Sequence, residues 1–265
     1  MKVSDQLNRT FTLDKPPSRI ISLVPSLTEL LCDLGLESSL VGITKFCVHP
    51  EHLRKNIKVI GGTKKVNFEK IKNLEPDIII ANKEENTLEI IQGLSKVAPI
   101  HISDIGNVED CCDLIEAYGK LFLKEIEAQD LNARIEEKVL NFQNSFKNKK
   151  VRSAAYFIWK NPWMVAASDT FIDYMLSLNS FSNIYSNKTR YPEVELKSMP
   201  KDLDFIFLSS EPYPFSNDEV IELGILFPKT KVILVDGEMF SWYGSRILKA
   251  IDYFENLNKE LDKLS

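Results

Sequence analysis

The sequence lacks the features that mark several large classes of protein. No run of its 265 residues approaches the roughly 18 apolar residues that a membrane-spanning helix needs. Basic residues do not outnumber acidic ones, since 33 Lys and Arg stand against 38 Asp and Glu, for a formal net charge of -5. We therefore expect neither a transmembrane protein nor a binder of nucleic acid or anionic membranes.

Cysteine and histidine are also scarce. The 4 Cys are too few and too unevenly placed for a disulfide scaffold, so free thiols are expected. Only 3 His are available for acid–base chemistry, and no Ser-His-Asp order, Gly-rich phosphate loop or paired His-Glu motif appears. We therefore expect a protein that is not an enzyme, with no tightly bound cofactor.

The composition is that of a soluble globular protein, with 44% hydrophobic and 27% charged residues. The first residues, Met1 to Lys15, are polar where a secretory signal needs an apolar stretch. The expected location is periplasmic or at the cell surface if a leader has been removed, and cytoplasmic otherwise.

Short apolar segments alternate with helical patterns along both halves of the chain. The strands predicted in the first half begin at Arg19 and continue at Leu40–Ile43, Lys58–Ile60, Asp77–Ala81 and Pro99–Ile102, with helices at Phe68–Leu74 and Leu88–Val97. The second half has predicted strands at Arg152–Trp159, Asp204–Ser209 and Lys231–Asp236, and helices at Phe171–Leu178, Asp218–Leu223 and Ser241–Leu257. Such alternation predicts an α/β fold with parallel central sheets.

The stretch from Val108 to Asn148 separates these halves. It has no Pro and one Gly, and its apolar positions recur at helical spacing. We expect a helical connector with a break near Leu123. An ordinary amphipathic helix within one domain is the alternative.

Several motifs resemble one family in their order along the chain. They are Pro16-Pro-Ser-Arg-Ile-Ile-Ser-Leu-Val-Pro-Ser-Leu-Thr-Glu29, Leu40-Val-Gly-Ile-Thr44, Val59-Ile-Gly-Gly-Thr63, the run from Asn67 to Ile80, Tyr191-Pro-Glu-Val-Glu-Leu196 and Asp202-Leu-Asp-Phe-Ile-Phe-Leu-Ser209. This succession is similar to the helical-backbone (class III) periplasmic solute-binding proteins of ABC importers for vitamin B12, ferric siderophores and haem, and closest to the corrinoid-binding branch.

The resemblance implies two Rossmann-like lobes with parallel central sheets joined by a long backbone helix. The expected boundaries are residues 1–107 for the N-terminal lobe, 108–148 for the connector and 149–265 for the C-terminal lobe. It also implies a monomer that captures a metal chelate, a corrinoid or ferric siderophore, between the lobes and delivers it to an ABC importer permease. An intracellular chelate-binding or sensing protein that does not dock on a transporter is the alternative, followed by a chelatase-like enzyme.

In the first half, residues that follow predicted strands are candidates for ligand contact, because open α/β sheets bind ligands at the carboxyl ends of their strands. Pro25 and Ser26 begin a helix, and the spacing of Ser26 and Glu29 predicts a capping box. The remaining candidates in this half are Phe46, His49, Asn82 and Glu84.

A bare-metal site at Cys47, His49 and His52 has suitable donors, but the spacing matches no established zinc site and no fourth ligand is evident. We favour a surface loop with a buried Cys47, with Phe46 packed on a macrocycle as a further interpretation. No metal bound directly by the protein is expected.

In the second half, aromatic and Met side chains follow the strands and suit a large flat ligand. The candidates are Trp163, Met164, Tyr213, Met239, Trp242, Tyr243 and Arg246. Arg246 is expected to reach a carboxylate or phosphate of the ligand. Trp159 is expected to be the buried member of its Trp pair.

The resemblance also implies one acidic docking residue on each lobe. The first-lobe position matches Glu69 in Asn-Phe-Glu-Lys-Ile, whereas the second-lobe position falls on Lys197. Glu193 and Glu195 lie close to Lys197 in the sequence and are candidates to replace the missing carboxylate.

Overall fold

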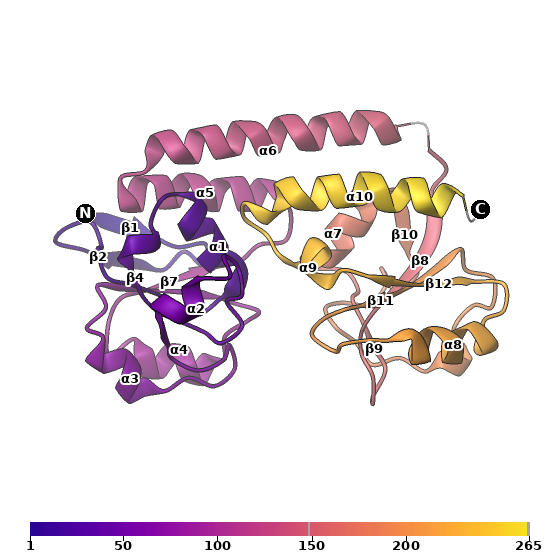
Figure 1. The fold of residues 1–265 in the computed structure, drawn as a ribbon, viewed down its shortest axis with the longest axis horizontal. Helices are drawn as coiled ribbons and strands as arrows, with labels where there is room; N and C mark the ends of the chain where they lie inside the picture. The colour runs from indigo at the N-terminus through magenta and orange to yellow at the C-terminus, as the bar shows by residue number, and fades with distance from the viewer. Residues whose placement is uncertain (148, 264–265) are drawn as a thin grey trace. The chain divides into compact units, whose positions relative to one another are not determined.

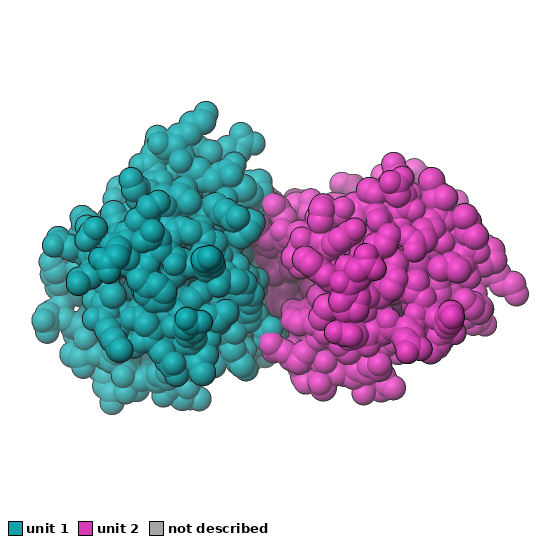
Figure 2. Space-filling model, turned by 90° about the horizontal axis from the view of Figure 1, so that it is seen from below, with its two compact units in different colours: residues 1–136, 243–248 teal, residues 137–242, 249–265 magenta. Residues whose placement is uncertain are grey.

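The computed structural model describes residues 1–147 and 149–263, and Figure 1 shows the fold. These residues form two compact units, coloured separately in Figure 2. The first comprises residues 1–136 and 243–248, and the second comprises residues 137–242 and the chain from 249 onward. Within the described ranges, none of the helices has the length and apolar character that a membrane span requires.

The first unit is built on a parallel five-stranded sheet with the order β5-β4-β3-β6-β7. The strands are β3 (Ile20–Ser22), β4 (Leu40–Ile43), β5 (Lys58–Val59), β6 (Ile78–Asn82) and β7 (Ile100–Ser103). The helices are α1 (Pro25–Asp33), α2 (Leu53–Asn56), α3 (Phe68–Asn73), α4 (Leu88–Leu94) and α5 (Val108–Phe122), with a short 3-10 helix at Glu37–Ser39. A separate hairpin pairs β1 (Lys2–Ser4) with β2 (Thr10–Thr12).

Both faces of this sheet are covered. Figure 1 shows α3 and α4 on the opposite side of the strands from α5. Every residue of β3, β6 and β7 is buried. This burial on both faces explains the apolar run Ile78–Ala81 in β6, whereas β7 also buries the polar His101 and Ser103 between its apolar residues.

The start of α1 differs from the prediction. The helix begins at Pro25, its N-cap is Val24, and no side chain caps its first turn. The predicted capping box was wrong because Ser26 and Glu29 both lie inside the helix, where the fixed φ of Pro25 at N1 starts the first turn without a side-chain cap.

The connector is helical and is interrupted where expected. α5 ends at Phe122, Leu123 adopts a left-handed conformation with φ 57°, and α6 (Glu125–Phe146) follows. The division between the two compact units falls inside α6, between Glu136 and Glu137. Asn148, the last residue assigned to the connector, lies outside the described residues.

The second unit has a sheet with the order β10-β8-β11-β12, in which these strands are parallel. Its strands are β8 (Arg152–Trp159), β10 (Phe181–Asn183), β11 (Phe205–Ser209) and β12 (Lys231–Val235), with β9 (Met164–Val165) added antiparallel to β8. Its helices are α7 (Phe171–Leu178), α8 (Asn217–Leu226) and α9 (Gly237–Ser241), with a 3-10 helix at Leu196–Ser198. The predicted α/β fold with parallel central sheets is confirmed.

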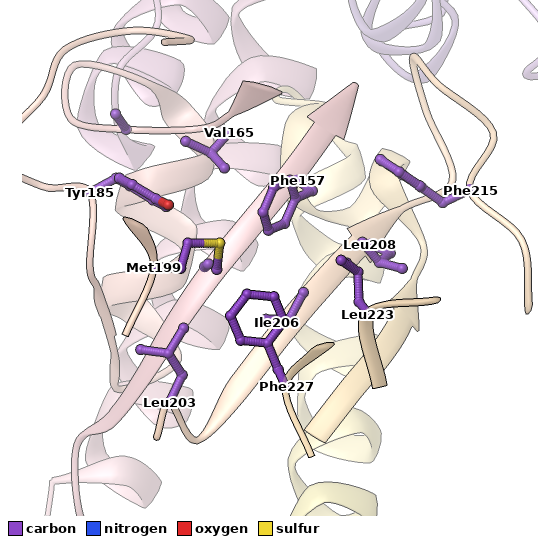
Figure 3. Close-up of a cluster of buried hydrophobic side chains, with 12 residues drawn as sticks. Phe157, Val165, Tyr185, Met199, Leu203, Ile206, Leu208, Phe215, Leu223 and Phe227 are labelled. Carbon is purple, nitrogen blue, oxygen red and sulfur yellow. The ribbon is translucent and has the colours of Figure 1, made fainter. Parts of the chain in front are cut away.

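One hydrophobic cluster fills the side of this sheet that faces α8 (Figure 3). Phe157 and Ile206 project from β8 and β11 and meet Leu223 and Phe227 from α8 and the turn after it. All four side chains are fully buried. Such burial of large apolar side chains holds the strand ends, and the loops that follow them, in fixed positions.

The C-terminal helix is broken where the sequence predicted one continuous helix from Ser241. α9 ends at Ser241, and α10 (Arg246–Asp262) begins after a turn in which Gly244 has φ +87°. That conformation is unfavourable for residues with a Cβ, so Gly244 permits the break. The segment Tyr243–Leu248 belongs to the first unit, and α10 continues into the second.

Candidate functional site

Each sheet has one point where the direction of strand addition reverses. In the first unit this switch point lies between β3 and β6, and in the second it lies between β8 and β11. Ligands of open α/β sheets bind outside the carboxyl ends of the strands at such points. The loops that follow these four strands are therefore the candidate site regions, and each is described within its own unit.

In the first unit, Asn82 at the end of β6 organises the loop that follows it. Its amide donates to the carbonyl and the hydroxyl of Ser103 at 3.1 and 3.0 Å, and its Oδ1 accepts from the backbone N–H groups of Glu84 and Glu85 at 2.7 and 3.2 Å. Asn82 is 1% exposed. The predicted ligand contact does not fit this geometry, because the amide is fully used in shaping the loop.

A second polar group of the first unit lies at the same switch point. Tyr243 is buried beside Ser26 and Ser103, and burial together with the nearby Glu85 carboxylate raises its pKa well above the ordinary value. Burial also raises the pKa of Glu85, which hydrogen bonds with Thr63. Glu85 was not among the predicted candidates, although it directly follows Glu84, which was one.

The loop after β4 presents an exposed aromatic ring. Phe46 is 49% exposed, and the Lys45 ammonium lies 4.8 Å from its ring centroid. His49 is half-buried in the same loop, whereas the His52 ring nitrogen pairs with Glu37 at 2.7 Å. Over the residues that the structure describes, no group of three or more metal-ligating side chains comes together.

Cys47 is buried in this loop, as predicted. Its Sγ lies 3.1 Å from the Thr28 hydroxyl and 3.3 Å from the Thr44 hydroxyl. Burial raises the pKa of its thiol. Cys47 therefore packs inside the unit and does not face solvent.

The second unit presents aromatic rings at its switch point. Trp159 ends β8, is 39% exposed, and meets Tyr213 edge to face with ring centroids 5.6 Å apart. Trp163 stacks on Phe215 at 5.9 Å and packs against the buried cluster. The expectation that Trp159 is the buried Trp was wrong, because β9 folds back on β8 and turns Trp163 toward the core.

The acidic side chain that follows β11 is held by the last residue of α9 and the residue after it. Glu211 accepts hydrogen bonds from the Trp242 indole at 2.8 Å and from the Ser241 hydroxyl at 3.0 Å. Trp242 is only 7% exposed. Its predicted role as a wall of the ligand site does not fit this burial, and Trp242 instead fixes the loop after β11.

Arg246 also differs from its prediction. Its Nε donates to the Glu29 carboxylate at 2.7 Å, and both side chains are 4% exposed. A buried guanidinium already paired with a carboxylate is not placed to meet a ligand anion. Met164, Met239 and Glu84 are each half-buried, so these three candidates keep some surface.

The candidate docking residues are all on the surface. Glu69 is exposed in the first turn of α3, where Asn67 caps the helix by accepting from the Lys70 N–H at 2.9 Å. In the second unit, Glu193, Glu195 and Lys197 are exposed around the 3-10 helix at Leu196–Ser198.

The fold and its two switch points define a two-unit open α/β protein with a polar edge on one sheet and an aromatic edge on the other. The chain belongs to the periplasmic binding protein family, whose model matches residues 20–212. The family resemblance carried by the sequence motifs is thereby confirmed.

Individual relatives agree with this assignment. The chain is 26% identical over 207 residues to the uncharacterized ABC transporter substrate-binding lipoprotein YvrC of Bacillus subtilis, a match that covers 75% of this chain and 65% of that protein, slightly under two thirds of its length. The crystal structure of the periplasmic vitamin B12 binding protein BtuF of Vibrio cholerae gives a TM-score of 0.77 at 22% identity, covering 94% of this chain and 99% of that one.

A structure described as an ABC-type Fe3+-hydroxamate transport system, from Saccharomonospora viridis, gives a TM-score of 0.75 at 20% identity and covers 98% of both chains. At these identities the structural likeness establishes the fold.

Proposed function

We propose that this protein captures a metal chelate, a corrinoid such as cobalamin or a ferric siderophore, for an ABC importer. Family membership and the names of the relatives support this class of ligand. The observation in this chain that carries the proposal is the aromatic edge of the second unit. Trp159 is exposed and Tyr213 is half-buried there, and rings of this kind supply much of the contact energy for a large, partly apolar ligand.

The first unit contributes polar contacts in this proposal. Pro25, half-buried at the start of α1, is kept as a contact in this proposal, whereas Ser26 is only 4% exposed and hydrogen bonds with Tyr243, so it is not used. Phe46, His49 and Glu84 retain surface in the loops after β4 and β6 and complete the proposed contacts. Such a ligand is transported cargo, so no resident cofactor and no bond-making step are involved.

The direct test is a titration with defined chelates. Cyanocobalamin, haem and a ferric trihydroxamate are added in turn, with binding followed by visible absorption, calorimetry and quenching of Trp fluorescence. We expect one of them to bind with 1:1 stoichiometry and to quench the emission of Trp159. A protein that binds none of the three at micromolar concentration would contradict the proposal.

Docking on the importer is proposed to use Glu69 in the first unit and Glu193 or Glu195 in the second. The exposed carboxylate of Glu69 suits an Arg on the permease, whereas Lys197 would repel it, and like charges placed together at an interface cost several kcal/mol. Glu69→Ala is expected to weaken association with a chelate importer at least tenfold, and Lys197→Glu to strengthen it, measured with the importer in lipid nanodiscs.

Glu89 supplies the matched control, because it is also exposed and also lies in the first turn of a short helix of the same unit. Glu89→Ala should leave association unchanged. If Lys197→Glu has no effect while Glu193→Ala and Glu195→Ala together abolish docking, the replacement contact is identified and the repulsion argument is wrong.

The exposed Lys197 also favours the second candidate function, an intracellular chelate-binding or sensing protein that does not dock. That function predicts chelate binding in the titration above together with no response to any of the docking variants. A gene whose product enters the periplasm or is anchored at the cell surface would contradict it.

A further inference from the structure

Two of the four cysteines lie close together in the first unit, on segments that are distant in sequence. Cys47 Sγ is 3.1 Å from the Thr28 hydroxyl. Cys32 is one helical turn beyond Thr28 in α1, and residues four apart on a helix lie on the same face, about 5–6 Å apart. The face of α1 that contacts Cys47 therefore also carries Cys32.

The packing of this region also places Cys32 close to Cys47. Cys47 forms a small buried cluster with Ile43 and Leu53, and Cys32 packs against that cluster. Cys32 is partly exposed, whereas Cys47 is fully buried. One thiol of the pair is thus reachable by a small disulfide reagent, and the second thiol lies behind it.

We propose that Cys32 and Cys47 form an intramolecular disulfide when the protein is held in an oxidising compartment, which links α1 to the loop that carries Phe46 and His49. Disulfides form and persist in such compartments and are rare in the cytosol. The structure describes the reduced state, in which all four cysteines are free.

The chemistry is thiol–disulfide exchange with glutathione disulfide as the oxidant. The Cys32 thiolate attacks the reagent and forms a mixed disulfide, releasing one glutathione thiolate. The Cys47 thiolate then attacks the Cys32 sulfur and releases the second. The two protons of the cysteines and the two electrons end on the two reduced glutathione molecules.

The rate should depend on pH, since the thiolate is the attacking species. Burial, with smaller effects of the nearby Glu37 and Asp33 carboxylates, raises the pKa of Cys32 to about 12. Exchange on the folded protein is therefore expected to be slow at neutral pH and faster as the pH rises. Refolding in a glutathione redox buffer removes this kinetic limit.

The test is peptide mapping of the full chain after refolding in reduced and oxidised glutathione, followed by trapping and trypsin digestion without reductant. Cleavage after Arg19, Lys45 and Arg54 places Cys32 and Cys47 in separate peptides, so a bond between them gives one cross-linked species. We expect that species, together with free Cys111 and Cys112.

Cys112 is the matched control, because it is half-buried like Cys32 and burial also raises its pKa, to about 11. Cys112→Ser should leave the cross-link in place, whereas Cys32→Ser should abolish it. The oxidised parent should also show slower hydrogen exchange over residues 45–49 than the reduced parent. Four free thiols, or glutathione on Cys32 without a cross-link to Cys47, would overturn the proposal. None of these readouts depends on chelate binding, so the proposed function is tested separately.

Discussion

The side chains around the two switch points differ in chemical character. In the first unit, buried polar groups dominate: Asn82 uses its whole amide to hold a loop, and Glu29 pairs with Arg246 out of contact with water. In the second unit, aromatic rings dominate, with Trp159 and Tyr213 partly exposed. Hydrogen-bonded edges are rigid and sensitive to substitution, whereas exposed rings can be removed without leaving an unpaired polar group.

Loss of the buried ion pair in the first unit should destabilise the protein most. Arg246→Met leaves the Glu29 carboxylate in a buried position without its guanidinium partner, and loss of one member of a buried pair costs about 3–5 kcal/mol. Denaturant unfolding should show this loss. The double variant Glu29→Gln with Arg246→Met is expected to recover part of it. If the parent and Arg246→Met have equal free energies of unfolding, the Glu29–Arg246 ion pair does not stabilise the protein.

A smaller effect concerns pH. Burial lowers the pKa of His101 from 6.5 to about 4, so the unfolded chain binds more protons than the folded one between those values. The stabilisation that comes from keeping His101 neutral in the folded state is present above pH 6.5 and is lost as the pH falls toward 4.

His101→Phe keeps a ring against Tyr118, whose centroid lies 5.2 Å away, and removes the titration. Between pH 7 and pH 5 the parent should lose about 2 kcal/mol more than this variant, measured by urea unfolding at each pH. Parallel stability curves for the two proteins would contradict the assignment of a buried neutral His101.

Most of the fold could be predicted from the sequence, because buried parallel strands leave continuous apolar runs. β4, β8 and α7 have the predicted boundaries. The break before α10 could not be predicted, since it depends on the left-handed conformation of Gly244 and on the pairing of Arg246 with a residue more than 200 positions away.

The candidate site was predicted less well than the fold. Position after a strand selects the loops at the two switch points, but it does not say which side chain of a loop turns inward. Trp159 is exposed and Trp163 packs against the buried cluster because β9 pairs back on β8, and a strand of only two residues has no recognisable sequence pattern. Trp242 is buried because its indole finds Glu211, a partner that only the folded chain supplies.

The proposed function requires that the metal chelate contact the aromatic edge of the second unit. It is tested most directly by calorimetric titration of the parent, Trp159→Ala and Trp163→Ala with the chelate that the parent binds. Trp159→Ala is expected to weaken binding about tenfold or more, on the order of 1.4 kcal/mol, with an unchanged Tm. Trp163→Ala should lower the Tm, because that half-buried ring packs against the buried cluster of the second unit. An affinity for Trp159→Ala equal to that of the parent would show that the chelate does not bind at this edge.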